Sequence, residues 1–267
     1  MKIVAWVCNQ PNQVALLNKI HEHFPLAGIV TETKRVKRKI TFKLLVTAVI
    51  ERLFLRAGAG VWWGLLEYYN RKYSAFPDVK TLDVENINSA AAYQFTKELE
   101  PDLVIVSGTR LIKKKLLSVD PRIGIINLHT GLSPYIKGGP NCTNWCIATN
   151  QFHLIGNTIM WLDLGIDTGN IIATAITEFT GDETLLEAHI KVMDQGHQLY
   201  IESIKHLAVG KDNNVPQQSI AEGQTFYNKQ WGLMERYRLA RNFKKLRSVV
   251  NSEKYRALKA EVKTVPL

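Results

Sequence analysis

Apolar residues near the start of the chain follow two patterns, short continuous runs and runs at helical spacing. Residues 2–8 form an apolar run with β-branched members, followed by a polar turn that contains proline, which predicts a buried strand. Residues 12–23 carry apolar side chains at the spacing of a helix, and residues 26–30 form a second short run. A strand, a helix and a strand in this order indicate a parallel, doubly wound sheet.

The same patterns continue farther along the chain. Periodic apolar positions resume at residues 79–87, and apolar runs that predict further strands lie at residues 102–108, 123–129, 158–162 and 171–175. Helices are expected at residues 88–98 and from Thr184, which opens a Thr-x-x-Glu capping box, to about Leu207. Residues 223–227 are expected to be extended, with helix after Trp231. We therefore expect an α/β fold with a Rossmann-like, mostly parallel sheet, helices on both faces and a short C-terminal extension.

Residues 34–75 interrupt the alternation with a basic lead-in and two apolar segments. These segments, 44–55 and 61–69, are separated by a glycine-containing break and are predicted to be two helices. The favoured interpretation is that they pack against their own domain, although a basic, aromatic-rich pair could also lie on a membrane or bind a partner. The expected organisation is one domain at residues 1–208, which includes this insertion, and a basic extension at residues 209–267.

Composition places the chain among globular proteins and locates its charge. Of its 267 residues, 46% are apolar and 22% charged, with a mean hydropathy of −0.10, which excludes a disordered chain. The net charge of the chain is +10. Residues 229–259 contain ten Lys or Arg and two acidic residues, so this segment alone carries a net charge of +8. The excess indicates an anionic partner for the extension.

The sequence also indicates the expected cellular location and excludes several kinds of site. No stretch is long and apolar enough to predict a membrane-spanning helix, and residues 1–7 lack the features of a signal peptide, so a cytoplasmic location is expected. Cys8, Cys142 and Cys146 are too few for a disulfide scaffold and lack zinc-site spacing. The first strand is not followed by Gly-x-Gly-x-x-Gly, and there is no Walker A motif.

Candidate chemistry lies between residues 108 and 169. Asn127 and His129 alternate at a strand end, so their side chains share one face. A loop rich in proline and glycine follows, and Asp167 lies in a glycine-flanked turn. Asn, His and Asp side chains suit acid–base chemistry and oxyanion stabilisation without an evident nucleophile. Two less favoured alternatives are Cys142 as a nucleophile beside His129, and a zinc site formed by His129, His153 and Asp167.

Four motifs in order resemble the folate-dependent formyltransferase family, which includes the glycinamide ribonucleotide, methionyl-tRNA and nucleotide-sugar enzymes. The motifs are Asn127-Leu128-His129, Ser133-Pro134-Tyr135-Ile136-Lys137-Gly138-Gly139-Pro140, Gly156-Asn157-Thr158 and Asp163-Leu164-Gly165-Ile166-Asp167-Thr168-Gly169. The resemblance is strong over residues 100–175 and poor over residues 34–75 and beyond about residue 210. It implies 10-formyltetrahydrofolate as donor, a primary amine as acceptor and no metal.

The resemblance also implies roles for individual residues. Asn127, His129 and Asp167 match the family's catalytic residues. The expected cofactor-binding residues are Gly108, Arg110, Leu111, Ile112, Leu162, Asp163, Leu164, Gly165 and Ile166. The expected acceptor-binding residues are Tyr135, Lys137, Gly138, Gly139 and Pro140. Ser133 and Lys137 depart from the usual Leu and Arg of this loop, which leaves contacts to the acceptor open.

The residue types fit such a transfer. Amine attack on a formyl carbon creates a tetrahedral oxyanion, to which Asn127 can donate a hydrogen bond and protonated His129 can add charge stabilisation. Asp167 can hold His129 in its charged form and move the proton that the amine loses. No covalent intermediate with the enzyme is required.

The acceptor is less well defined than the reaction. The chain is closer in size to the nucleotide-sugar enzymes than to the other members, because the methionyl-tRNA enzymes carry a larger C-terminal β-barrel. We therefore expect a nucleotide-linked amino sugar used in surface polysaccharide (O-antigen) synthesis. Alternatives are methionyl-tRNA, glycinamide ribonucleotide or a non-catalytic basic binding protein on the same scaffold.

The extension would then meet the acceptor. Its basic residues Arg236, Arg238 and Arg241 are expected to contact the acceptor's pyrophosphate, and Phe226, Tyr227 or Trp231 either stacks on its base or packs onto the core. A homodimer is compatible with the resemblance, whereas membrane and nucleic-acid partners are not expected.

Overall fold

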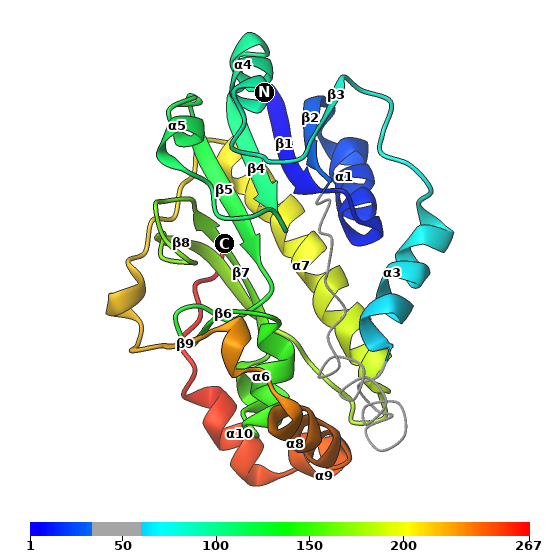
Figure 1. Cartoon of the computed structure of the whole chain (residues 1–267). Helices are drawn as coiled ribbons and strands as arrows, with labels where there is room; N and C mark the ends of the chain where they lie inside the picture. Colours follow the sequence, from blue (N-terminus) through cyan, green and yellow to red (C-terminus); the bar gives the residue numbers. More distant parts are fainter. Residues whose placement is uncertain (34–59) are drawn as a thin grey trace.

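The computed structural model describes residues 1–33 and 60–267 and contains one large sheet with helices on both faces (Figure 1). Its strands, in the spatial order β3-β2-β1-β4-β5-β7-β8, confirm the predicted α/β class. The strands are β1 (Ile3–Cys8), β2 (Leu26–Glu32), β3 (Thr81–Val84), β4 (Leu103–Ser107), β5 (Gly124–His129), β7 (Gly156–Trp161) and β8 (Ile171–Ile176). The first five strands are parallel, whereas β7 runs antiparallel to both β5 and β8.

Helices lie in the connections between these strands and in the segment after β8. The helices are α1 (Pro11–His23), α3 (Val61–Lys72), α4 (Ala90–Glu98), α5 (Lys114–Leu117), α6 (Cys142–Ala148), α7 (Leu185–Ala208), α8 (Leu233–Phe243), α9 (Leu246–Val250) and α10 (Glu253–Ala260). The second helix predicted in the insertion is α3, and the first lies outside the described residues.

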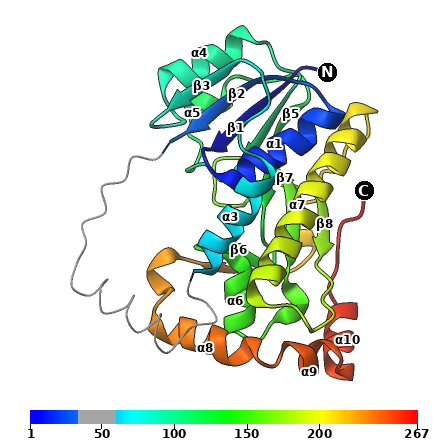
Figure 2. The same ribbon diagram turned by 90° about the vertical axis from the view of Figure 1, so that its right-hand side faces the viewer.

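The sheet is buried on both sides because successive side chains of a strand point to opposite faces. From β1, Ile3, Ala5 and Val7 pack in the cluster that contains side chains of α1 and α7. Val4 and Trp6 pack on the other face with side chains of α4 and α5. Figure 2 shows these two helical layers from the side. Near-continuous apolar strands are the expected result of such double coverage.

Helix α7 is the longest of the described helices and fixes the middle of the sheet. Thr184 and Glu187 form the predicted capping box at its start. Its Tyr200 is fully buried, and the hydroxyl accepts a hydrogen bond from the Val106 backbone N–H at 2.8 Å and lies 2.8 Å from the Ile126 carbonyl, to which it donates. One side chain therefore ties the carboxyl-terminal parts of β4 and β5 together.

The residues after α7 contact the body of the protein at several points. Strand β9 (Gln224–Phe226) pairs in parallel with β6 (Ile136–Gly138), and α8 packs on α6. Near the end, Val265 exchanges hydrogen bonds with Thr174 of β8. None of the described helices is long and apolar enough to cross a membrane.

We expect Tyr200→Phe to lower the free energy of unfolding by about 1–3 kcal/mol, because the backbone groups of β4 and β5 then lose a buried partner. Chemical denaturation measures this change. Tyr255→Phe is the matched control, because the Tyr255 hydroxyl is buried without a hydrogen-bond partner among the described residues. Equal destabilisation by the two substitutions would contradict a specific role for the Tyr200 hydroxyl.

Candidate functional site

A cavity of about 540 Å³ opens at the carboxyl ends of β1, β4 and β5. This volume lies within the range of about 300–1,000 Å³ that is usual for ligand pockets. Its wall contains polar side chains from the last residues of β5, the first turn of α1 and the loop between β7 and β8. Ligands of open α/β sheets bind at this edge, so the cavity is the natural place for chemistry.

The cavity brings together the three residues expected to be catalytic. Asn127 and His129 alternate on β5 and both line it, as the strand pattern predicts. Asp167 arrives from the β7–β8 loop, and its Oδ2 lies 3.3 Å from Nδ1 of His129. The Asn127 amide makes no hydrogen bond with any described residue, so it is available to a ligand.

The His129 ring fits tightly in its place. Its side chain is only 10% exposed. Nε2 lies 3.3 Å from the Ile136 carbonyl and 3.5 Å from Sγ of Cys142. A Cβ atom at Gly131 would stand 2.3 Å from Nε2, so only glycine leaves room for the ring there. The imidazole is thus held by packing on one side and by Asp167 on the other.

The charge of Asp167 decides the protonation state of this ring. Burial lowers the pKa of His129 and is the largest single influence on it. The Asp167 carboxylate, with further contributions from Cys142 and the Ile136 carbonyl, outweighs burial and raises that pKa from the usual 6.5 to about 10. His189 provides the contrast, because burial without a carboxylate lowers its pKa to about 4. His129 is therefore an imidazolium at neutral pH, and its Nδ1–H donates to Asp167.

The two alternative chemistries receive no support from this geometry. Cys142 does lie beside His129, but burial raises the pKa of its thiol despite the opposing effect of the nearby imidazolium, so the thiol stays protonated. His153 lies in a 3₁₀ turn (Phe152–Leu154) packed against α10 rather than at the cavity. The described residues contain no group of three or more His, Cys, Asp or Glu side chains suited to a metal.

The loop that carries Asp167 is held from both sides. Asp167 has a left-handed backbone with φ of 53°. Its Oδ2 accepts a hydrogen bond from the Gly138 backbone N–H at 3.2 Å. Gln217, from the C-terminal segment, donates from Nε2 to the carbonyls of Asp167 and Gly169 at 2.8 Å each. The strained residue is thus fixed by surrounding contacts.

Gln217 and Thr158 are positioning residues that sequence reasoning missed in this role. Thr158 accepts a hydrogen bond from the Ser133 N–H at 2.9 Å and donates to the Gly131 carbonyl at 2.7 Å. It thereby fixes the turn after His129. Thr158 belongs to a motif that marks the family, whereas nothing in the sequence near Gln217 indicates a contact 50 residues away.

The segments expected to bind the cofactor are mostly in place. Eight of those nine residues line the cavity, and Leu164 is the exception, with 63% of its surface exposed. The guanidinium of Arg110 is engaged by the buried carboxylate of Glu32 and by the Glu85 carbonyl. Arg110 therefore holds the loop after β4 in shape.

The proline- and glycine-rich loop is divided between two tasks. Gly138 and Pro140 line the cavity, whereas Tyr135, Lys137 and Gly139 do not. The Tyr135 hydroxyl instead accepts a hydrogen bond from the Lys263 N–H at 2.8 Å. The loop thus joins the site to the C-terminal segment as well as bordering a ligand.

Another part of the wall was not predicted from sequence. It contains Gln10, Asn12 and Gln13 around the start of α1, together with Trp62 of α3. Trp62 is 39% exposed at the cavity, and Trp63 beside it is 75% exposed and does not line it.

Two of the three aromatic residues proposed for the acceptor's base pack onto the core. Phe226 stacks on Trp145 with ring centroids 4.2 Å apart, and Trp231 meets Trp145 edge-on. Tyr227 is half exposed.

Comparison with known proteins assigns the chain to a family. The sequence profile described as formyl transferase matches residues 66–204, a segment that contains Asn127, His129 and Asp167. The chain belongs to the formyl transferase family. Among curated members, it is 35% identical over 134 residues to the methionyl-tRNA formyltransferase of Clostridium botulinum, a match that covers 50% of this chain and 41% of that protein. The chain thus spans less than half the length of this relative.

Solved structures of formyltransferases share the fold over a larger part of the chain. The N-formyltransferase of Helicobacter canadensis, in complex with folinic acid and dTDP-3-aminofucose, covers 91% of this chain and 81% of its own, with a TM-score of 0.57 and 17% identity. Glycinamide ribonucleotide transformylase 1 of Symbiobacterium toebii covers 80% of this chain and 94% of its own, with a TM-score of 0.53 and 18% identity. At these identities the likeness is one of fold.

Replacing Asp167 with Asn should lower the pKa of His129 well below about 10, because the largest influence that opposes burial of the imidazolium is then removed. NMR titration of the ring follows this shift. In the native protein, the raised pKa contributes stability in full below about pH 6.5, and that contribution is lost as the pH rises through about 10.

Asp163→Asn is the matched control for this substitution. Asp163 lines the same cavity, and its Oδ1 binds the Thr168 hydroxyl rather than His129. It should leave the titration of His129 unchanged. A pKa near 10 in the Asp167→Asn protein would show that another group charges the ring.

Proposed function

We propose that the protein transfers a formyl group from 10-formyltetrahydrofolate to the primary amine of a nucleotide-linked amino sugar. The observation that carries the proposal is the buried imidazolium–carboxylate pair of His129 and Asp167 beside the free amide of Asn127, in a chain of the formyl transferase family. Positive charge and an amide donor at one cavity suit a reaction that develops negative charge on oxygen.

Each of the three side chains has a distinct task in this reaction. The Asn127 amide donates a hydrogen bond to the oxygen of the tetrahedral intermediate, and the His129 imidazolium stabilises its charge. Asp167 keeps His129 protonated and accepts, directly or through water, the proton that the attacking amine loses. Collapse of the intermediate breaks the bond between the formyl carbon and the folate nitrogen, and that nitrogen takes up the proton as tetrahydrofolate leaves. The Cys142 thiol is protonated and therefore a poor nucleophile, and the reaction requires no covalent intermediate with the enzyme.

The cavity has features that suit a reduced folate. The formyl donor supplies an activated one-carbon group, and it needs an apolar, partly open cleft with backbone hydrogen-bonding groups. Leu111 and Ile166 line the cavity with 56% and 49% of their surfaces exposed, which leaves apolar area for a ring system to cover. The loops at Gly108–Ile112 and Leu162–Ile166 provide the backbone groups.

The nucleotide-sugar acceptor is supported by the extent of the structural matches. The Helicobacter canadensis structure, whose bound ligands are folinic acid and dTDP-3-aminofucose, matches over 91% of this chain. The Francisella tularensis 4-N formyltransferase matches over 89% of this chain, with a TM-score of 0.53 and 18% identity. A role in surface polysaccharide synthesis would follow from such an acceptor.

Methionyl-tRNA is the second candidate acceptor. The curated relatives at 35% identity are methionyl-tRNA formyltransferases, and the C-terminal helices are basic. Their match is confined to about half of this chain, so the nucleotide sugar remains the favoured acceptor.

An acceptor screen tests the proposal. The protein is incubated with 10-formyltetrahydrofolate and each of a panel of amino-sugar nucleotides, glycinamide ribonucleotide and methionyl-tRNA, and the gain of a formyl group is read by mass. We expect an amino-sugar nucleotide to be formylated. Formylation of methionyl-tRNA alone would replace the proposed acceptor, and no formylation of any amine would refute the proposed reaction.

Substitutions at the catalytic residues should separate chemistry from folding. Asn127→Ala is expected to reduce kcat by about 10²–10³ because an oxyanion donor is lost. His129→Ala and Asp167→Ala should each reduce it by at least about 10²–10⁴. His153→Ala is the control, since His153 lies away from the cavity. A folded His129→Ala protein with normal turnover would exclude the assigned role.

Trp62 offers a test of where the acceptor binds. Its ring lies on the part of the wall that neither expected folate loop forms, so it can stack on the acceptor's base. Stacking of about 0.5–1.5 kcal/mol predicts a rise of roughly two- to twelvefold in acceptor KM for Trp62→Ala, with kcat nearly unchanged. Trp63→Ala, on the exposed side of α3, should change neither. A rise in the KM for the folate alone would assign Trp62 to the donor.

A further inference from the structure

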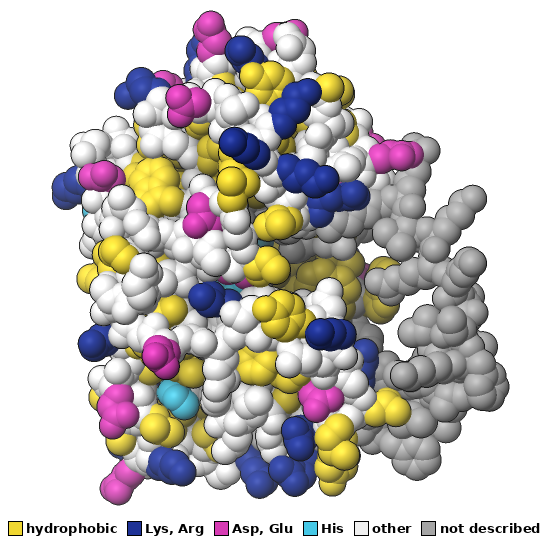
Figure 3. All heavy atoms as spheres, turned by 60° about the vertical axis from the view of Figure 1, so that its left-hand side comes forward, with side chains coloured by type: hydrophobic (Ala, Val, Ile, Leu, Met, Phe, Trp, Pro, Cys, Tyr) yellow, Lys and Arg dark blue, Asp and Glu magenta, His cyan; other side chains and the backbone are white. Residues whose placement is uncertain are grey.

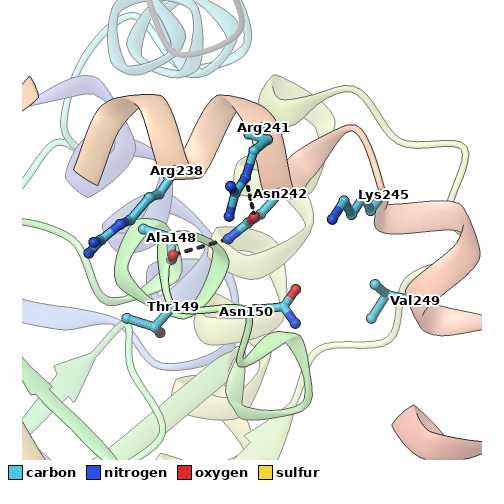
Figure 4. Close-up of a pocket in the computed structure, with 8 residues that line it drawn as sticks. All are labelled: Ala148, Thr149, Asn150, Arg238, Arg241, Asn242, Lys245 and Val249. Carbon is cyan, nitrogen blue, oxygen red and sulfur yellow. Dashed lines mark hydrogen bonds between the residues drawn. The ribbon is translucent and has the colours of Figure 1, made fainter. Parts of the chain in front are cut away.

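A second pocket, of about 350 Å³, lies between the carboxyl end of α6 and the helices α8 and α9 (Figure 4). Its wall is formed by Ala148, Thr149, Asn150, Arg238, Arg241, Asn242, Lys245 and Val249. None of these residues lines the catalytic cavity, so the two hollows are separate among the described residues. We call it the α8 pocket.

The α8 pocket is strongly positive. Three of the residues lining it are cations, Arg238, Arg241 and Lys245, and none is acidic. Arg238 has a single long ion pair, 3.7 Å from Glu235, and Lys245 has none with the described residues. Figure 3 shows Lys and Arg side chains gathered at the lower end of the molecule, where Figure 1 places α8, α9 and α10. Like charges at this spacing repel one another, so a bound anion would be stabilising.

The Asn242 side chain binds two backbone carbonyls beside the pocket and so reduces their negative potential. Asn242 is 4% exposed and donates from Nδ2 to the carbonyls of Ile147 and Ala148 at 3.0 Å each. These carbonyls are at the carboxyl end of α6, where the partial charge would otherwise repel an anion. Leu239 and Leu246 anchor the opposite side of the helices in the core. The cations therefore project from a rigid support.

The spacing of the cations indicates the size of the anion. Arg238 and Arg241 are about one turn apart on α8, and Lys245 follows in the turn between α8 and α9. In Figure 4 the Lys245 amine points toward Arg241 above Asn150, whereas the Arg238 side chain extends away from both. Two linked phosphoryl groups offer more contacts to such a row of cations than a single phosphate does.

We propose that the α8 pocket binds the diphosphate group of a small molecule, as a site separate from the catalytic cavity. Arg241 and Lys245 hold the two phosphoryl groups, Arg238 adds charge at the far end, and the Asn150 side chain is a further donor. Arginine and lysine in this arrangement form charge-assisted hydrogen bonds that favour phosphate over weaker anions. The limited volume favours a small ligand over an extended polyanion.

Calorimetric titration of the whole protein with inorganic pyrophosphate tests this site without depending on enzymatic activity. The native protein should bind pyrophosphate saturably, at one site per chain and about tenfold more tightly than orthophosphate, because a second charged contact is added. The Arg241→Gln/Lys245→Gln protein should bind pyrophosphate at least about tenfold more weakly.

The matched control is the Lys229→Gln/Lys244→Gln protein. It loses the same net charge, and both lysines lie outside the α8 pocket without side-chain partners among the described residues. It should change pyrophosphate affinity by less than about twofold. Circular dichroism and thermal unfolding confirm that both variants are folded.

Three results would overturn the proposal. Equal weakening in both double variants would mean diffuse attraction to a basic surface, and absence of saturable binding would mean no site. Tighter binding of a short RNA oligonucleotide than of pyrophosphate, lost in the Arg241→Gln/Lys245→Gln protein, would assign the pocket to nucleic acid. Saturable pyrophosphate binding by the native protein, weakened in the Arg241→Gln/Lys245→Gln protein but not in the Lys229→Gln/Lys244→Gln protein, would establish the site. This result does not depend on whether the protein formylates any amine.

Discussion

The structure around the catalytic cavity depends on one contact, the 3.3 Å approach of the Asp167 carboxylate to Nδ1 of His129. A buried imidazole normally loses its proton, as the lowered pKa of His189 illustrates. At His129 the carboxylate, helped by Cys142 and the Ile136 carbonyl, reverses that preference, so a positive charge persists inside the protein. Gly131, Gly138 and Gln217 leave room for these two side chains or hold the loop that carries Asp167.

Their meeting is a consequence of strand direction. Because β7 runs antiparallel to β5, the chain leaves the sheet at Trp161 and must return toward the end of β5 before β8 begins. That return places Asp167 over His129, where Gly138 and Gln217 fix its loop. A fully parallel sheet would send this segment through a crossover helix and offer no such loop.

The sequence contained enough to predict most strands of the large sheet, the order of the early helices and the meeting of Asn127, His129 and Asp167 at one cavity. Asn127 and His129 could be assigned to one face because strands have a period of two, and the capping box at Thr184 marked the start of α7. Contacts between distant segments were not predictable in this way. Gln217 lies near Asp167 only after the chain has folded back, Trp62 reaches the cavity through the packing of α3, and Tyr135 binds Lys263 instead of facing the cavity. No local pattern encodes such distances.

The hydrogen bonds of Gln217 also bear on when, during synthesis of the chain, the loop that carries Asp167 is fixed. A growing polypeptide that has emerged only as far as α7 already contains Asn127, His129 and Asp167. It still lacks the amide that fastens the carbonyls of Asp167 and Gly169, and the β9 strand that pairs with β6. The left-handed backbone at Asp167 is therefore secured late in synthesis, by residues that take no part in the reaction. Maturation of the site follows the arrival of the segment after α7.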